Sequence, residues 1–321
     1  MKLPIIYTKK HKEHNPPYEI YDGVKESYAE KADRIESIVT TLKNNNFTSF
    51  MSPRRFSLDH IHALHQKVYV DFVRTRSKRL RDDEILYPSY FIMDTYSPIT
   101  AGTYGAAYSS VNVALTGAEL IICGENIVYS LCRPPGHHAE QKMMGGYCYF
   151  NNAAIAAHYL AQHGKVAILD VDFHHGNGTQ NLFYDRSDVL YVSIHADPKV
   201  KFPYNSGFSD EKGRGEGEGY TVNYPLPLGT TPQKYQKFLQ RALSDIRIFK
   251  PDYLIVSLGF DTYEHDPIGG FQLTIPYYQS MAEDISTLKV PTLLVQEGGY
   301  NISDLGEMAT SFLKGFEKLS K

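Results

Sequence analysis

The chain has no tryptophan and only three cysteines in 321 residues, Cys123, Cys132 and Cys148. The cysteines form no CxxC pair and their number is odd, which argues against a disulfide framework and against a zinc site built from thiolates. We expect them to be buried thiols. We therefore do not expect the cysteines to carry the function of this chain.

Long apolar runs and a large excess of one charge are also missing. Segment 1–6 contains no apolar stretch of signal-peptide length, and no run approaches the roughly 20 apolar residues of a membrane span. The formal net charge of −3 gives no reason to expect nucleic acid or an anionic membrane as a partner. We expect a cytoplasmic protein that binds neither, so the substrate must be inferred from the site itself.

The first hundred residues carry weak patterns. Apolar residues near helical spacing predict an amphipathic helix over 26–43. A mixed segment follows to about residue 98, and within it the dense charge run 74–84 is expected to be a solvated loop. Its role is not apparent from the residues.

From residue 104 onward, short apolar runs alternate with helical stretches, which is typical of parallel strands joined by crossover helices. The expected strands are 127–131, 166–171, 189–194, 253–258 and 292–296, and the expected helices are 105–115, 152–162, 178–184, 231–249 and 276–288. Continuous apolar runs indicate strands that are buried on both faces. With no linker or repeat, we predict one α/β domain over residues 1–321, with a mostly parallel central sheet and helices on both faces.

Chemically capable side chains follow successive predicted strands. The segments concerned are Pro-Gly-His-His at 135–138, Asp-Val-Asp-Phe-His-His at 170–175, His-Ala-Asp at 195–197, Gly-Phe-Asp at 259–261 and Glu-Gly-Gly-Tyr at 297–300. Ligands of open α/β sheets bind beyond the carboxyl ends of the strands, where such loops converge. We therefore expect these segments to form one site.

The spacing in segment 170–175 favours a metal. Asp170, Asp172 and His174 are two apart, so an extended strand would direct them to the same face. Catalytic zinc usually has three protein ligands and an open position, and Asp172, His174 and Asp261 would form such a set. Two carboxylates and one histidine also suit iron(II) or cobalt(II). A two-manganese centre of the arginase type would need a second carboxylate at position 263, which is Tyr263.

Other residues at the same edge offer proton transfer and hydrogen bonding. Metal-assisted hydrolysis needs a group that moves protons and a donor for the developing oxyanion. His137 and His138 can move protons, and Tyr300, after two glycines, can donate a hydrogen bond. Asp170 is expected to orient a histidine from behind the ligands, and His175 to shape the turn. Taken singly, each of the acids and histidines could instead be a cap or a salt-bridge partner at a strand end, and Tyr300 could be a turn tyrosine on the surface.

Together these motifs resemble the histone deacetylase superfamily, and within it the bacterial acetylpolyamine amidohydrolases. The resemblance extends from about residue 98 to 315 and is carried by segments 98–103, 130–138, 145–152, 170–180 and 297–300. It implies the arginase-deacetylase fold and a hydrolase that removes acetyl groups from acetylated amines. It also implies one Zn²⁺ per chain and a structural K⁺ or Na⁺.

The resemblance also assigns roles to individual residues. Zinc ligands would be Asp172, His174 and Asp261, with His138 as general base and acid. It implies that His137 is the electrostatic partner of His138 and is held by Asp170, and that Tyr300 polarises the acetyl carbonyl. Tyr147 and Phe202 would form the walls of a narrow tunnel. The Gly146 carbonyl would face the substrate amide. Asp170 and Ser193 would bind the monovalent cation, and a second such site would lie near Phe183, Val189 and Tyr220.

One residue and one segment depart from the family pattern. Asn177 stands where some members place an Asp beside the second catalytic histidine, which would change how His138 is tuned. The segment 72–104 is shorter than in polyamine enzymes whose inserted loop supports a dimer and narrows the entrance. A homodimer is therefore an open expectation. The alternatives are an acetyl-lysine deacetylase acting on proteins or peptides, a non-catalytic acyl-group binder and, less favoured, a ureohydrolase.

Overall fold

The structure is a computed structural model that describes residues 3–316. Its order of elements begins with β1 (Ile5–Ile6), η1 (Lys9–Glu13), β2 (Tyr18–Tyr21), β3 (Val24–Ser27), α1 (Asp33–Asn44), β4 (Phe50–Met51), α2 (Asp59–His62), α3 (Lys67–Arg79) and α4 (Thr103–Ile122). It continues with β5 (Ile127–Ser130), α5 (Asn152–Leu160), β6 (Val166–Asp170), α6 (Asn177–Phe183), β7 (Val189–Ala196), η2 (Gly215–Gly217), β8 (Thr221–Leu226), α7 (Pro232–Phe249), β9 (Tyr253–Leu258), α8 (Ile275–Ser286), β10 (Thr292–Gln296) and α9 (Ile302–Lys314).

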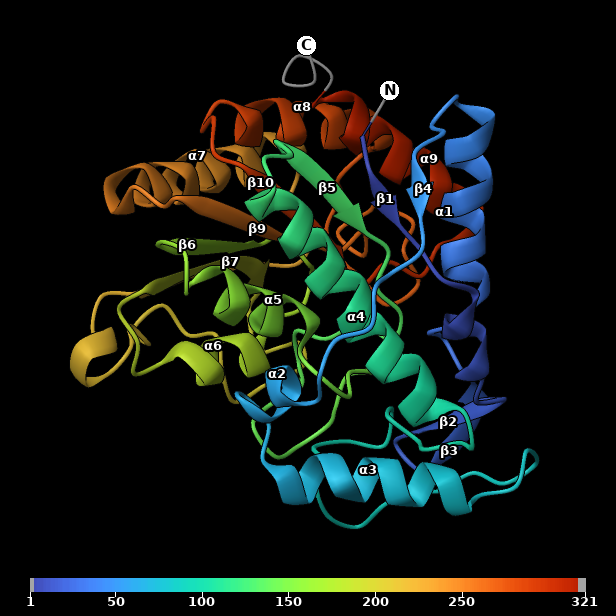
Figure 1. Cartoon of the computed structure of the whole chain (residues 1–321). Coiled ribbons are helices and arrows are strands. Elements are labelled where there is room, and N and C mark those ends of the chain that lie inside the picture. Colours follow the sequence, from blue (N-terminus) through green and yellow to red (C-terminus); the bar gives the residue numbers. More distant parts are fainter. Residues whose placement is uncertain (1–2, 317–321) are drawn as a thin grey trace.

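Eight strands form one sheet in the order β4-β1-β5-β10-β9-β6-β7-β8, and every neighbouring pair is parallel. Helices lie on both faces of this sheet, as Figure 1 shows. This is the predicted fold class, and all five strands predicted from the sequence are present. The parallel order brings the carboxyl ends of β5, β6, β7, β9 and β10 to the same edge, where the site is found.

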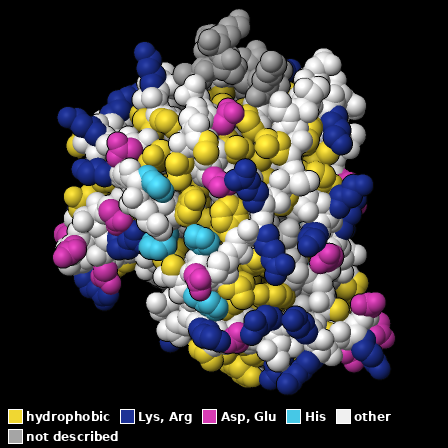
Figure 2. Space-filling view, in the orientation of Figure 1, with side chains coloured by type: hydrophobic (Ala, Val, Ile, Leu, Met, Phe, Trp, Pro, Cys, Tyr) yellow, Lys and Arg dark blue, Asp and Glu magenta, His cyan; other side chains and the backbone are white. Residues whose placement is uncertain are grey.

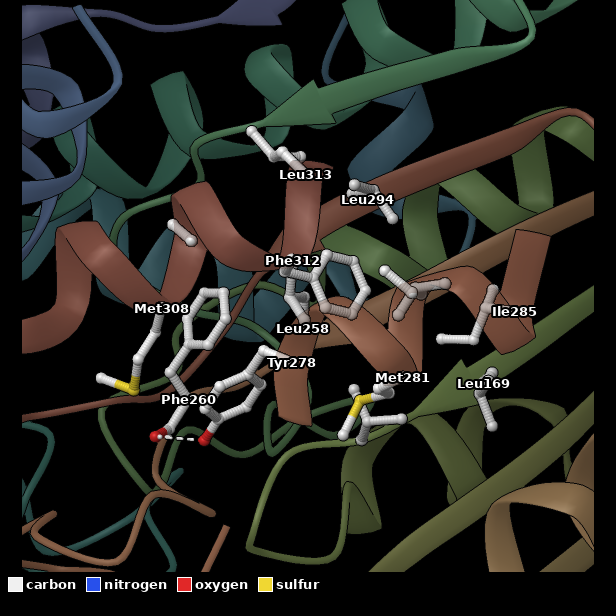
Figure 3. Packing of buried hydrophobic residues seen from close by; sticks show 14 of the residues in the cluster. Leu169, Leu258, Phe260, Tyr278, Met281, Ile285, Leu294, Met308, Phe312 and Leu313 are labelled. Carbon is white, nitrogen blue, oxygen red and sulfur yellow. Dashed lines mark hydrogen bonds between the residues drawn. The ribbon is translucent and has the colours of Figure 1, made fainter. Parts of the chain in front are cut away.

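Alternation along the strands explains the two layers of the core. Leu169 of β6 belongs to a buried cluster that also contains residues of α1, α7, α8 and α9, whereas Ile168 belongs to a second cluster that contains residues of α4 and α5. Figure 3 shows part of the first layer, where Phe260 and Tyr278 lie in contact and the Tyr278 hydroxyl donates to the Phe260 carbonyl at 3.3 Å. Burial on both faces accounts for the continuous apolar runs of these strands.

Two of the three cysteines are the buried thiols that were expected, Cys132 and Cys148. Cys123 is exposed instead, because it directly follows the last residue of α4 at the surface.

The helix expected in the N-terminal third is only partly correct, and the short strands of this region were not expected. Residues Val24–Ser27 form the second strand of a hairpin, so the helix predicted over 26–43 begins only at Asp33. A tight turn explains this, because Asp22 and Gly23 have φ of 47° and 82° and thereby close the hairpin. The short strands β1 and β4 also join the main sheet. Two residues each are too few to produce a recognisable pattern.

The charge run 74–84 is only partly the loop that was expected. Its first residues, Arg74 to Arg79, form the last turns of α3, whose apolar residues Val70 and Val73 are buried. Figure 2 shows Lys and Arg side chains gathered over this helix at the lower end of the molecule. The helix has a buried side, so its charges occupy the remaining surface. Among residues 3–316, no helix is both long and apolar enough to cross a membrane.

Candidate metal and catalytic centre

Asp172, His174 and Asp261 meet beyond the ends of β6 and β9, with one ligand atom from each within 4.8 Å of the others. In the part of the chain that the structure describes, this is the one group of three His, Cys, Asp or Glu side chains so arranged. The Nδ1 atom of His174 lies 2.9 Å from Oδ2 of Asp261 and 3.5 Å from Oδ1 of Asp172. All three side chains are buried.

Electrostatics at this group fits a bound cation. Burial, followed by the charge of Asp172, raises the pKa of Asp261 to about 7. Burial opposes ionisation of His174, but hydrogen bonds with Asp172 and Asp261 raise its pKa to about 9. Two buried carboxylates brought face to face are costly unless a positive charge lies between them. The donor set of two carboxylates and one imidazole is one that zinc accepts.

Two glycines leave room for these carboxylates. A Cβ atom on Gly259 would lie 2.0 Å from Oδ2 of Asp172, and one on Gly298 would lie 2.6 Å from Oδ2 of both Asp172 and Asp261. The Gly298 backbone N–H donates to Asp172 at 2.8 Å. Glycine is therefore required here by close approach and not by turn conformation.

The two histidines after β5 have different surroundings. Nδ1 of His137 lies 3.1 Å from Oδ2 of Asp170, and Nδ1 of His138 lies 2.8 Å from Oδ1 of Asn177. Burial opposes a charge on His137, but Asp172 and Asp170 raise its pKa to about 10. Burial lowers the pKa of His138 well below its usual value, and the neighbouring histidines lower it further. His137 thus favours the protonated, cationic ring, whereas His138 favours the neutral ring, which can act as a base.

Tyr300 lies beside a buried arginine. The guanidinium of Arg34 is 4.8 Å from the centre of the Tyr300 ring and donates to the carbonyls of Gly299 and Glu297. The Tyr300 backbone N–H donates to Asp266 at 2.6 Å. Burial raises the pKa of the Tyr300 phenol well above its ordinary value, so it remains a hydrogen-bond donor.

A cavity of about 400 Å³ leads to this group, and its walls include Gly146, Tyr147, Phe202 and Tyr300 together with His138 and His174. The Phe202 ring is 4.9 Å from that of His138, and the Tyr147 ring is 5.6 Å from that of Tyr300. The residues expected to contact substrate therefore share one cavity. Gly146 is held by its N–H, which donates to Asp94 at 2.7 Å.

The residues expected around a monovalent cation lie together behind the centre. Asp170 and Ser193 are register partners on β6 and β7, and both are buried. The Ser193 hydroxyl lies 2.7 Å from Nδ1 of His195. A cation there stays a prediction, as does the second site near Phe183, Val189 and Tyr220. His175 contacts Gln180 and His195 instead of the ligand group.

The network that supports the site contains residues to which the sequence analysis assigned no role. Fully buried Glu30 pairs with Arg34 at 2.6 Å and with Arg133 at 2.9 Å. Glu297 accepts from the N–H groups of Gly136 and His137 at 2.7 and 3.2 Å, which holds the turn before the histidine pair. No pattern in one sequence distinguishes such buried charges from solvated ones. The hairpin that carries Glu19 does have one sequence signal, the Asp-Gly pair at its turn, residues 22–23.

Comparison with known proteins agrees with this geometry. A family profile described as "Histone deacetylase domain" matches residues 28–316. Acetylpolyamine amidohydrolase 2 of Pseudomonas aeruginosa is 42% identical over 97% of this chain and 98% of its own length. The acetylpolyamine amidohydrolase of Mycoplana ramosa is 39% identical over 98% and 99%.

A solved structure is similar over the whole chain. The crystal structure of acetylpolyamine aminohydrolase from Burkholderia pseudomallei superposes with a TM-score of 0.94 at 37% identity, covering 99% of both chains. The profile and the relatives show that this chain belongs to the histone deacetylase family. The resemblance inferred from the motifs, and the arginase-deacetylase fold it implied, are thereby confirmed.

Proposed function

We propose that this protein is a zinc-dependent amidohydrolase that removes acetyl groups from small acetylated amines and releases acetate. The observation that carries the proposal is that three metal-binding side chains meet, and that one of them, His174, lines the same cavity as His138 and Tyr300. The family membership and the names of the relatives support the same chemistry, with acetylpolyamines as the reference substrates. We take residues 1–321 as a single deacetylase domain with one zinc ion.

Asp172, His174 and Asp261 would hold the zinc ion. When bound, zinc would polarise the acetyl carbonyl and make water a better nucleophile at neutral pH. Asp170 and Ser193 would hold the structural K⁺ or Na⁺, in accord with their pairing across β6 and β7. Two of the zinc ligands, Asp172 and His174, and the monovalent site would then lie next to one another at the end of strand β6.

His138 would take a proton from the attacking water and later give it to the departing amine. Asn177 supports this role, because its Oδ1 accepts the Nδ1 proton and leaves Nε2 of the neutral ring free to accept another. His137 would carry positive charge beside the reacting carbonyl, since Asp170 accepts its Nδ1 proton. The two rings would therefore divide proton transfer and charge stabilisation between them.

Tyr300 would donate its phenolic hydrogen bond to the carbonyl oxygen as negative charge develops there. Tyr147 and Phe202 would enclose the methylene chain of the substrate, because both line the cavity beside the reacting groups. The Gly146 carbonyl would accept from the substrate amide. Such contacts would align the acetyl group with His138 and Tyr300.

Acetate release from acetylputrescine and acetylspermidine by the zinc-loaded protein tests this proposal. We expect activity that is lost on chelation and that falls roughly 10²–10³-fold in Tyr300→Phe, the usual effect of removing an oxyanion donor. Arg34 and Asp266 would still hold the Phe ring and backbone, so the variant isolates the hydroxyl. A protein that binds zinc but releases no acetate from any acetylated amine would be a non-catalytic acyl-group binder.

An acetyl-lysine peptide deacetylase is the second candidate, because the matching family profile carries the histone deacetylase name. Comparing kcat/KM for acetylputrescine, acetylspermidine and an acetyl-lysine peptide separates the two. We expect the small amines to be preferred. A tenfold advantage for the peptide would replace the small-amine assignment with the peptide one.

A further inference from the structure

Three charged side chains besides the catalytic groups line the cavity: Glu19, Glu26 and Lys201. Within residues 3–316, none of them takes part in an ion pair. The two acids lie on the β2–β3 hairpin and the lysine on the loop after β7, so the charges come from separate elements. Charges left unpaired by the protein around a substrate cavity indicate what the substrate carries.

The acidic pair is arranged for a cation. Glu19 and Glu26 are direct register partners on antiparallel strands, where like charges oppose each other unfavourably. Glu19 is only 5% exposed, and its carboxylate accepts from the Tyr147 hydroxyl at 3.2 Å. Burial, together with the charges of Glu26 and Asp94, raises its pKa to about 7. An ammonium group bound between the two acids would relieve both the repulsion and the burial cost.

Lys201 offers the opposite charge in the same cavity. Its side chain is half-buried, and its ammonium lies 5.7 Å from the centre of the Phe173 ring. Its hydrogen-bond partner is the Ile268 carbonyl, at 3.4 Å. The partly buried stem restricts where the ammonium can go. One long bond to a neutral carbonyl leaves the remaining N–H groups able to donate to an anion.

We propose that Lys201 binds a carboxylate of the substrate, beside an ammonium group bound by Glu19 and Glu26. The inference rests on the proposed function and names its substrate class: amino acids whose side-chain amine is acetylated, with Nε-acetyl-L-lysine as the simplest. The acetylated arm would extend between Tyr147 and Phe202, and the zwitterionic end would meet the three charges. An acetylpolyamine could place an ammonium group between Glu19 and Glu26, but it has no carboxylate and would leave Lys201 without a partner.

N-acetylcadaverine is the matched comparison, because it is Nε-acetyl-L-lysine with the carboxylate replaced by hydrogen. We would measure kcat/KM for both compounds by acetate release, using the metal-loaded full chain. We expect the wild type to favour Nε-acetyl-L-lysine by about tenfold or more, which corresponds to one charge-assisted hydrogen bond. In Lys201→Ala, the ratio of the two kcat/KM values should fall about tenfold, and Lys201→Glu should reverse the preference.

Lys199→Ala is the control, since Lys199 lies exposed on the same loop and does not line the cavity. It should keep the wild-type ratio. Equal or better hydrolysis of N-acetylcadaverine by the wild type would overturn the inference while leaving a deacetylase. So would a ratio in Lys201→Ala that stays within about twofold of the wild type. Failure of the wild type to release acetate from either compound would overturn the inference; failure with acetylputrescine and acetylspermidine as well would overturn the proposed function with it.

Discussion

Replacing Asp170 by Asn tests the division of labour between the two histidines. Oδ2 of Asp170 accepts from Nδ1 of His137 at 3.1 Å and from the Tyr191 hydroxyl at 3.0 Å, while Oδ1 accepts from the Asp172 N–H at 3.1 Å. In the variant, the new amide N–H₂ group cannot face the Asp172 N–H, because both groups are donors, so it must face Nδ1 of His137. The imidazole would then accept at Nδ1 and carry its proton at Nε2, and its positive charge would be lost.

The expected magnitudes follow from these contacts. Losing a preorganised charge beside the carbonyl should lower kcat about 10²–10³-fold, or about 3–4 kcal/mol of transition-state stabilisation. The mismatched buried contacts should lower the free energy of unfolding by only about 1–3 kcal/mol. Acetate-release kinetics and urea unfolding measure the two effects separately, and the zinc content of the variant must equal that of the wild type.

Tyr191→Phe is the matched control for this change. It removes the other donor to Oδ2 of Asp170 but leaves the contact with His137 in place. We expect a loss of about 1 kcal/mol in unfolding free energy and a kcat close to that of the wild type. If Asp170→Asn kept kcat within about threefold, or if Tyr191→Phe were equally impaired, the assigned role of Asp170 would be wrong.

Three further outcomes are expected. Burial raises the pKa of Glu19 to about 7, so its carboxylate gains a proton and loses its charge as the pH falls through 7. KM for an ammonium-bearing substrate should therefore rise as the pH falls through 7, and Glu19→Gln should abolish this pH dependence of KM. In Asn177→Asp, a carboxylate 2.8 Å from Nδ1 should raise the pKa of His138 and move the acid limb of the kcat/KM profile to higher pH. In Gly259→Ala, the new Cβ would lie 2.0 Å from Oδ2 of Asp172, so zinc affinity, measured by competition with a chelator, should fall at least about tenfold.

The site could be predicted from the sequence because its residues follow consecutive buried strands. Once β5, β6, β9 and β10 were recognised as parallel, their following loops had to converge, which joined His137, Asp172, Asp261 and Tyr300. Within segment 170–175, the spacing of two residues predicted that Asp170, Asp172 and His174 lie on the same face. These inferences need only the direction of each strand and not the details of packing.

The N-terminal third could not be predicted in the same way. All four residues of β3 are exposed, so no apolar alternation marks it, and the helix predicted over 26–43 includes its last two residues. Arg34 and Glu30 are fully buried, yet in sequence they look like the polar side of an amphipathic helix. Only the fold reveals that their partners are Arg133 and the backbone of the Tyr300 loop. Expectations for the location of the protein in the cell and for a homodimer stay predictions.

Metal titration of the metal-free protein, with acetate release followed at each step, tests the central claim most directly. The account predicts that activity returns in proportion to zinc and saturates at one ion per chain. It also predicts that Asp261→Asn, which alters one of the three ligands, neither binds zinc tightly nor recovers activity. Saturation at two ions per chain, or full activity in the metal-free protein, would contradict it.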